Sequence, residues 1–217
     1  MTRSDERDAQ MQTVLVANRK GGVGKTMISV SLASALAATG ARVAIADADA
    51  QQSALAWLAL RPADAAAIRG LSWKKAADIG EHPKKLDWLV IDAPGALKGS
   101  RAEALIAEAR AVVTPLQPGL FDLGATRLFL DEIEDIKRIR KGKVPVHLVA
   151  NRLRPGRAAA GLEAAAADLG RPLTARIPER AGYADLAMQG LAPFDGTRVT
   201  HRRLAEPFTP LLEALDG

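Results

Sequence analysis

Short, almost wholly apolar runs alternate along the chain with longer stretches in which apolar residues recur every three or four positions. The runs are typical of strands buried on both faces of a sheet, and the longer stretches are typical of helices that cover it. The runs occupy residues 13–18, 42–46, 86–91, 111–116, 144–150 and 173–177. The helical stretches occupy residues 26–39, 51–60, 121–140, 158–169, 183–189 and 199–215. This alternation predicts an α/β fold with a doubly wound, mostly parallel sheet and helices on both faces.

Two parts of the pattern leave more than one interpretation. Between residues 61 and 85 we expect a helix at residues 63–68 and a short strand at residues 70–73. The helix at residues 121–140 has an apolar stripe that can cover the sheet or meet a partner. Its members are Phe121, Ala125, Leu128, Ile133, Ile136 and Ile139.

The three tryptophans, Trp57, Trp73 and Trp88, are interpreted as core residues, since basic residues do not alternate around all of them.

Length and composition bound the class of protein. With 217 residues, 48% of them hydrophobic, the chain suits one α/β domain, which we place at residues 11–217. Residues 1–10 are charged and aperiodic, so we expect a disordered tail. Cysteine is absent, which excludes disulfides, thiolate zinc sites and iron–sulfur clusters. Without a signal peptide or a run as long as a membrane span, we expect a cytoplasmic protein.

Positive charge is concentrated in one part of the chain. Residues 137–203 hold 14 Lys and Arg against 5 Asp and Glu, an excess larger than the net charge of +5 for the whole chain. Such asymmetry favours a surface that faces a polyanion. The alternative is a solvated basic surface in which some cations compensate helix C-termini.

A glycine-rich segment joins the first predicted strand to the first predicted helix. It reads Lys20, Gly21, Gly22, Val23, Gly24, Lys25 and Thr26. Glycines let consecutive backbone N–H groups converge on phosphate oxygens, and the following helix N-terminus attracts negative charge. In such a loop Lys25 reaches the terminal phosphates and Thr26 binds Mg²⁺. The usual motif has glycine where this chain has Arg19, and the second lysine, Lys20, follows it.

Three aspartates stand at strand ends, where a parallel sheet collects its ligands. Asp47 and Asp49 follow the strand at residues 42–46, and Asp92 ends the strand at residues 86–91. A carboxylate at the end of a buried strand can organise the water shell of Mg²⁺. Asp47 and Asp49 have an alternative role as caps of the next helix.

The loop, with Lys20 as well as Lys25, closely resembles the deviant P-loop of the ParA/MinD family of dimerising ATPases. The Asp-x-Asp-x-Gln segment at residues 47–51 is similar to the family's too, and the resemblance covers nearly all of residues 11–217. It implies that ATP and Mg²⁺ bind, with Asp47 near the metal and Asp92 as the Walker B aspartate.

The resemblance also implies the roles of other residues. Lys20 would act on ATP bound to the opposite subunit, and Asp49 would orient the attacking water. Asn151 resembles the family's adenine contact, since an amide can donate to and accept from a purine edge. Residues 115–123 are similar to a segment that contributes to the dimer face. The expected nucleotide-binding residues are Gly21, Gly22, Val23, Gly24, Lys25, Thr26, Met27, Asn151, Arg152 and Pro178.

Within the family, the chain resembles the small partition ATPases. This resemblance implies a homodimer that forms when ATP binds and that binds DNA of the nucleoid without sequence preference. It also implies a ParB-like or other adaptor protein that links the ATPase to plasmid, chromosome or protein cargo. The candidate DNA contacts are Arg152, Arg154, Arg198, Arg202 and Arg203. The spacing of Arg152 and Arg154 is compatible with contacts to the nucleotide, to a partner chain or to DNA.

Two other functions share parts of this pattern. A MinD-like ATPase that works at a membrane surface would use the same site, but its C-terminus carries a basic amphipathic anchor, whereas Glu213 and Asp216 are acidic and two prolines interrupt the helix. A metabolic P-loop enzyme would use ATP to activate a small substrate, and Lys20 is untypical of that class.

Overall fold

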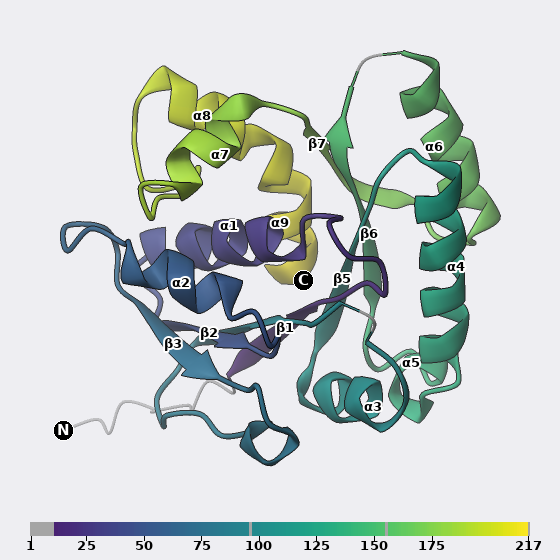
Figure 1. Ribbon diagram of the computed structural model, residues 1–217, viewed down its shortest axis with the longest axis horizontal. Coiled ribbons are helices and arrows are strands. Elements are labelled where there is room, and N and C mark those ends of the chain that lie inside the picture. Colours follow the sequence, from purple (N-terminus) through teal and green to yellow (C-terminus); the bar gives the residue numbers. More distant parts are fainter. Residues whose placement is uncertain (1–10, 96, 155, 217) are drawn as a thin grey trace, which may run out of the picture.

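The computed structural model describes residues 11–95, 97–154 and 156–216. The expected tail at residues 1–10 therefore lies outside the described residues. Seven strands form one sheet in the order β3-β2-β4-β1-β5-β6-β7, and every pair is parallel (Figure 1). The strands are β1 (Gln12–Val16), β2 (Val43–Asp47), β3 (Ile68–Ser72), β4 (Trp88–Asp92), β5 (Ala111–Leu116), β6 (Val146–Leu153) and β7 (Leu173–Pro178). This confirms the predicted fold class.

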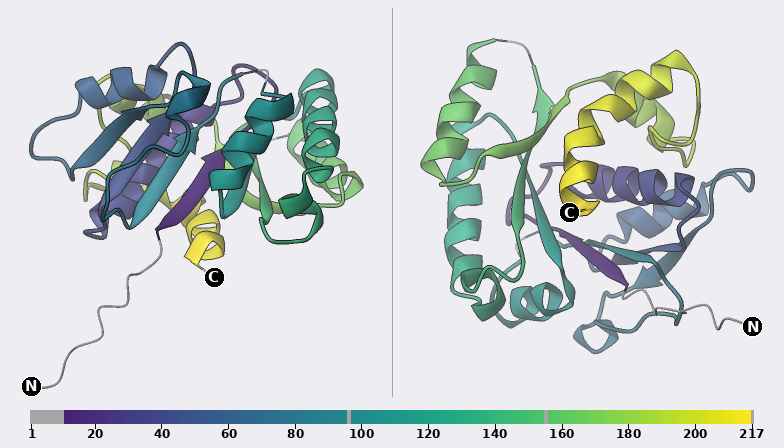
Figure 2. Two further views of the ribbon diagram at one scale, coloured as in Figure 1. Left: turned by 90° about the horizontal axis from the view of Figure 1, so that it is seen from below. Right: turned by 180° about the vertical axis from the view of Figure 1, so that it is seen from behind.

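Helices cover both faces of the sheet. The α-helices are α1 (Lys25–Ala38), α2 (Ser53–Ala59), α3 (Gly99–Glu108), α4 (Leu120–Glu134), α5 (Lys137–Arg140), α6 (Arg157–Asp168), α7 (Ala181–Ala187), α8 (Val199–Ala205) and α9 (Thr209–Asp216). Short 3₁₀ turns lie at Ala76–Asp78 and Glu206–Phe208. One core cluster joins the sheet to α3, α4, α5 and α6, and a second joins it to α1, α2, α7, α8 and α9. Figure 2, seen from behind, shows α8 and α9 in yellow on the same face as α1.

The alternation of strand side chains produces these two layers. Along β1, Leu15 belongs to the first core cluster, while Val14 and Val16 belong to the second. The wholly apolar runs of the sequence are strands that bury both faces at once. Every strand pair is parallel, so all carboxyl ends lie on one edge of the sheet. In that register Asp47 lies beside Asp92, and Asp92 lies beside Val16.

Two local predictions were wrong. Residues 63–68 form turns and the start of β3 rather than a helix. The helix expected at residues 121–140 is divided into α4 and α5, and its predicted stripe is buried only in its second half, at Ile133 and Ile139. Phe121 and Leu128 are 80% and 58% exposed, because α4 turns a neighbouring stripe toward the sheet. The buried residues of α4 are Thr126, Phe129, Leu130 and Ile133.

The tryptophans and the C-terminal helices agree with expectation. Trp57 and Trp73 are buried, and Trp88 is half-buried against the second core cluster. The predicted helix at residues 199–215 is interrupted by a 3₁₀ turn that contains Pro207, because proline has no N–H to donate. No helix within the described part of the chain is long and apolar enough to cross a membrane.

Candidate nucleotide-binding site

The glycine-rich loop connects the carboxyl end of β1 to the N-terminus of α1. Gly22 and Gly24 have φ angles of 76° and 94°, in the left-handed region where a side chain is unfavourable. Gly24 is the N-cap of α1, and no side chain caps this helix. The first backbone N–H groups of a 14-residue helix therefore face the loop, which is an arrangement that attracts phosphate.

The two lysines of the loop have different surroundings. The Lys25 side chain is buried, and its Nζ donates to the Lys20 carbonyl oxygen at 3.1 Å. Burial lowers the pKa of Lys25, against the opposing effect of the Asp92 and Asp49 carboxylates. The Lys20 side chain leaves the loop, is 40% exposed, and places Nζ 3.9 Å from Asp122 Oδ1 on α4. The Lys25 side chain therefore stays within the loop, whereas the Lys20 side chain extends out of the loop toward α4.

Asp92, Thr26 and Ser29 form a buried cluster between β4 and α1. Thr26 Oγ1 donates to Asp92 Oδ2 at 2.7 Å, and Ser29 Oγ donates to Asp92 Oδ1 at 3.0 Å. Burial raises the pKa of Asp92 to about 7, although the hydroxyl of Thr26 acts to lower it. A hydroxyl and a carboxylate are hard oxygen donors of the kind Mg²⁺ prefers. The Thr26 hydroxyl and the Asp92 carboxylate therefore fit Mg²⁺. Among the described residues, there is no group of three or more His, Cys, Asp or Glu that could hold a metal ion.

Asp47 and Asp49 differ in what they contact. Asp47 is fully buried, and its Oδ2 accepts from the N–H groups of Ala54 and Leu55 at 2.8 and 3.2 Å. Burial raises its pKa. Asp47 therefore caps the start of α2, and its expected place near Mg²⁺, beside Asp92 in the sheet, stays a prediction. Asp49 Oδ1 accepts from Gln51 N–H at 2.9 Å, just before α2, while its Oδ2 accepts from Gly95 N–H at 3.2 Å, which links it to the loop after β4.

A cavity of about 490 Å³ lies beside the loop, between β6, β7 and α7. Asn151 forms one wall, and its Nδ2 donates to the Val23 carbonyl at 2.7 Å. A Cβ on Gly24 would lie 2.1 Å from that nitrogen, so only glycine fits there. The Asn151 Oδ1 atom is buried without a hydrogen-bond partner in the structure. The lining residues are Gly24, Met27, Asn151, Arg152, Pro178, Glu179, Arg180, Ala181, Tyr183, Ala184 and Ala187.

This cavity brings together five of the expected nucleotide-binding residues from three separate parts of the sequence: Gly24, Met27, Asn151, Arg152 and Pro178. Its position next to the phosphate loop suits a purine base. The sequence analysis missed the wall that α7 contributes, including Tyr183. An apolar wall built from alanines and one tyrosine carries no motif, and only the fold identifies it.

The loop also has buried supports that the sequence analysis missed. Asn18 Nδ2 donates to the Pro115 carbonyl and to Thr126 Oγ1, and its Oδ1 accepts from Lys20 N–H. Gln117 Nε2 donates to the Gly22 carbonyl at 3.2 Å. Asn18 could have been recognised in the sequence as a polar residue at the end of an otherwise apolar strand, since a buried polar group needs hydrogen-bond partners.

The five arginines considered for DNA contact are all exposed. Arg152 lies at the mouth of the cavity with a φ angle of 53°, and Arg154 forms an ion pair with Glu179. Arg202 and Arg203 occupy the last turn of α8, and Arg198 is its N-cap. The Arg203 carbonyl accepts from Arg180 at 3.5 Å, which connects α8 to the rim of the cavity.

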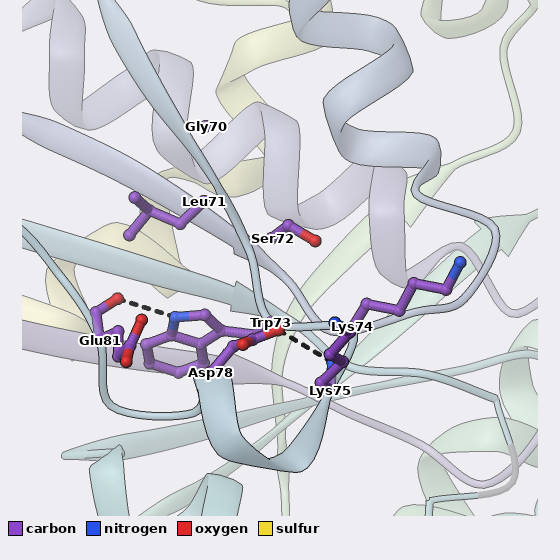
Figure 3. Close-up of a pocket in the computed structure, with 8 residues that line it drawn as sticks. All are labelled: Gly70, Leu71, Ser72, Trp73, Lys74, Lys75, Asp78 and Glu81. Carbon is purple, nitrogen blue, oxygen red and sulfur yellow. Dashed lines mark hydrogen bonds between the residues drawn. The ribbon is translucent and has the colours of Figure 1, made fainter.

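A second cavity, of about 470 Å³, lies at the carboxyl end of the edge strand β3 (Figure 3). The Trp73 indole N–H donates to the Glu81 carbonyl at 2.9 Å across its wall, with Lys75 and Asp78 nearby. None of the predicted site residues lines it.

The carboxyl edge of the sheet thus has the layout of a P-loop nucleotide-binding protein: a glycine-rich loop at a helix N-terminus, with a hydroxyl in the first turn of that helix bonded to a carboxylate at the end of the neighbouring strand β4. The chain belongs to the CobQ/CobB/MinD/ParA nucleotide-binding domain family, whose model matches residues 14–194. The expected family resemblance is therefore confirmed.

Individual proteins of known name are also similar. The "Maintenance of carboxysome distribution protein A" of Halothiobacillus neapolitanus is 29% identical over 188 residues, covering 84% of this chain and 86% of that one. A structure of the McdA–ATP complex from Cyanothece has a TM-score of 0.78 at 18% identity, covering 96% and 97% of the two chains. The septum site-determining protein MinD of Pyrococcus horikoshii, complexed with Mg-ADP, has a TM-score of 0.70 at 19% identity, covering 95% and 96%.

Proposed function

We propose that this protein is an ATPase that dimerises when it binds Mg²⁺ and ATP, binds DNA without sequence preference, and positions a cargo through cycles of hydrolysis. The observation that carries the proposal is the divergence of the two loop lysines. Lys25 is buried beside the loop, whereas Lys20 is directed away to α4. A triphosphate needs more positive charge than one lysine supplies, and Lys20 can supply it to ATP held by a second copy of the chain.

The residues of the site divide the chemistry between them. Backbone N–H groups at residues 21–26 and the Lys25 ammonium would bind the phosphates, and the oxygens of Thr26 and Asp92 would hold Mg²⁺, which neutralises phosphate charge. Asp49, with one oxygen on Gly95 N–H, would orient the attacking water. Because that N–H belongs to the loop after β4, Asp49 would also sense a change in this loop.

The base would occupy the cavity beside Asn151. The donor Nδ2 of Asn151 already binds the Val23 carbonyl, so its Oδ1 is left to accept a hydrogen bond. The exocyclic amine of adenine is a donor, whereas guanine presents a carbonyl oxygen at the same position. This orientation of the amide therefore favours ATP over GTP.

DNA binding would use the exposed arginines near the nucleotide edge. Lysine and arginine contacts to phosphate are independent of sequence and weaken with salt. A dimer doubles them, so ATP would switch DNA affinity, and the protein would associate with the nucleoid in the cytoplasm. Arg202 and Arg203 are the clearest candidates, because they are adjacent in the last turn of α8 and both are exposed.

The cargo is proposed to be a large protein assembly that an adaptor protein links to the ATPase. Support comes from the relative named for carboxysome distribution, which matches most of both chains. Plasmid or chromosome cargo with a ParB-like adaptor is the second candidate, since the nucleotide site would be the same. Identifying the adaptor that stimulates ATP hydrolysis would distinguish the two candidates, because that adaptor binds either a protein assembly or plasmid or chromosomal DNA.

A titration of non-specific duplex DNA tests this proposal. The wild-type chain is measured with ATP, with ADP and without nucleotide, at salt concentrations between about 50 and 200 mM. We expect binding that needs ATP and weakens with salt, and an Arg202→Glu/Arg203→Glu double variant that binds less. Arg69→Glu, on the opposite edge strand β3, is the matched control and should bind normally. DNA binding that is equal in all nucleotide states would contradict the proposal.

A membrane-surface role is disfavoured by the packing of the C-terminal helices. Phe208 and Leu211 are fully buried in the second core cluster, so the apolar face of α9 is occupied by the core. Sedimentation with anionic liposomes and ATP separates this alternative from DNA binding. A metabolic P-loop enzyme would instead show ATP turnover that depends on a small substrate.

A further inference from the structure

Lys20 belongs to a closed ring of contacts that joins the start of the phosphate loop to α4. Its backbone N–H donates to Asn18 Oδ1 at 3.1 Å. Asn18 Nδ2 donates to Thr126 Oγ1 at 2.9 Å, and Thr126 Oγ1 donates to the Asp122 carbonyl at 2.8 Å. The Asp122 carboxylate returns to Lys20 Nζ at 3.9 Å. Both the backbone and the side chain of Lys20 are thus tied to the same helix.

The part of this ring formed by Asn18 and Thr126 is shielded from water, and the hydrogen-bonding groups of the Asn18 amide all have partners. Asn18 and Thr126 both have no exposed surface. The Asn18 amide donates to both Pro115 and Thr126 while it accepts from Lys20. An amide whose donors and acceptor are all engaged in a buried position has one orientation. The position of the Lys20 backbone is therefore set by α4 and β5 as well as by the loop.

We propose that Asn18 and Thr126 are positioning residues for Lys20, and that they hold it in the geometry from which it reaches the nucleotide of a second subunit. The inference rests on the proposed role of Lys20 across a dimer. It adds that the signature lysine depends on two polar residues that lie outside the phosphate loop, one of them 106 positions away on α4. Neither residue touches the nucleotide cavity.

A purely structural role would show itself differently. If the network only stabilised the loop, its loss would weaken the binding of a single nucleotide to a single chain. If it positions Lys20, its loss leaves nucleotide binding by one chain intact and weakens the step that needs Lys20 from the other. Mg-ADP affinity reports the first property, and ATP-dependent dimerisation reports the second.

The experiment compares Thr126→Val with Thr126→Ser by sedimentation equilibrium with ATP and by calorimetric titration with Mg-ADP. Valine keeps the shape of threonine but removes the hydroxyl, whereas serine retains it. Thr114→Val is the matched control, because Thr114 is equally buried and its hydroxyl has no hydrogen-bond partner among the described residues. We expect Thr126→Val to weaken the ATP dimer about tenfold, as the loss of a buried hydrogen bond implies, with Mg-ADP affinity within about twofold of wild type. Thr126→Ser should restore dimerisation.

Asn18→Asp provides a second test, since it keeps the acceptor for Lys20 N–H and removes the donors to Pro115 and Thr126. It should reproduce the Thr126→Val result. Equal losses of ADP affinity and dimerisation, or no change in either, would overturn the inference. Failure of the wild-type chain to dimerise with ATP would instead overturn the proposed function, so the two failures are distinguishable.

Discussion

Lys20 and Asp122 form an ion pair within one chain, with 3.9 Å between Lys20 Nζ and Asp122 Oδ1. The pair joins the phosphate loop to the first turn of α4. Both side chains are partly exposed, at 40% and 21%, so the contact is weak and can open. A lysine that must reach another subunit therefore has an intramolecular partner to leave first.

Replacing Asp122 by asparagine should favour the ATP dimer. The variant removes the charge that holds Lys20 within its own chain, and an exposed pair is worth at most about 1 kcal/mol. A dimer opens two such pairs, so the expected result is a dimer up to about 30-fold tighter in sedimentation equilibrium with ATP. Asp131→Asn, a change of an exposed acid on the same helix, is the control. A weaker dimer in Asp122→Asn would show that the carboxylate supports the dimer instead.

Replacing Gly24 by alanine should weaken nucleotide binding. The new Cβ would lie 2.1 Å from Asn151 Nδ2, and the residue would keep a φ angle of +94°. The loop and Asn151 must then separate, which disturbs the phosphate loop and the base cavity together. Calorimetric titration with Mg-ADP should show an affinity at least about tenfold lower, equivalent to about 1.4 kcal/mol. Gly124→Ala, in open space on α4, should bind normally.

The ion pair between Arg61 and Asp195 should contribute strongly to stability. It is buried, with side chains 6% and 1% exposed, and Arg61 donates to both Asp195 oxygens at 2.6 and 2.8 Å. Removing the Asp195 charge leaves the Arg61 guanidinium buried without a counter-charge, although it still donates to the Ala66 and Gly190 carbonyls, so Asp195→Asn should lower the free energy of unfolding by about 3 kcal/mol. Thermal unfolding measures the change. Asp185→Asn, at an exposed position on α7, should change it little.

The effect of Asp195 should also depend on pH. Burial acts to raise the pKa of Asp195, but hydrogen bonds from Arg61 and Ala192 N–H leave it below the ordinary value of 3.8. A carboxyl whose pKa is lowered by folding contributes its full stability above that ordinary value and loses it as pH falls through the folded value. The difference between wild type and Asp195→Asn should therefore be constant near neutral pH and shrink below about pH 4. A difference that grows in acid would contradict this assignment.

The fold was predictable because six of the seven strands correspond to apolar runs, whereas β3 is the polar exception. The boundaries of β2 and β5 differ from expectation by no more than one residue. The error at residues 63–68 arose because alanines there fit a helix equally well, while pairing of Ile68–Ser72 with β2 decided the outcome. On α4, the residues around Phe121 and those around Phe129 offer two apolar stripes, and the sequence does not say which faces the sheet.

The candidate site was predictable where a motif fixes chemistry to spacing. Lys25, Thr26 and Asp92 come together as expected, because the loop and the strand end lie on one edge of a parallel sheet. Asn18 and Tyr183 were not predicted, since their roles depend on side-chain contacts between segments far apart in the sequence. The roles of Asp49 and Lys20 in catalysis remain predictions.

The dimerisation of Lys20→Ala with ATP tests the central claim most directly. The Lys20 side chain leaves its own phosphate loop toward α4, and its proposed target is the nucleotide of a second subunit. Sedimentation equilibrium should therefore show a wild-type dimer with ATP and a Lys20→Ala chain that stays monomeric, while both bind Mg-ADP with similar affinity. A Lys20→Ala chain that dimerises with ATP at wild-type affinity would contradict the account.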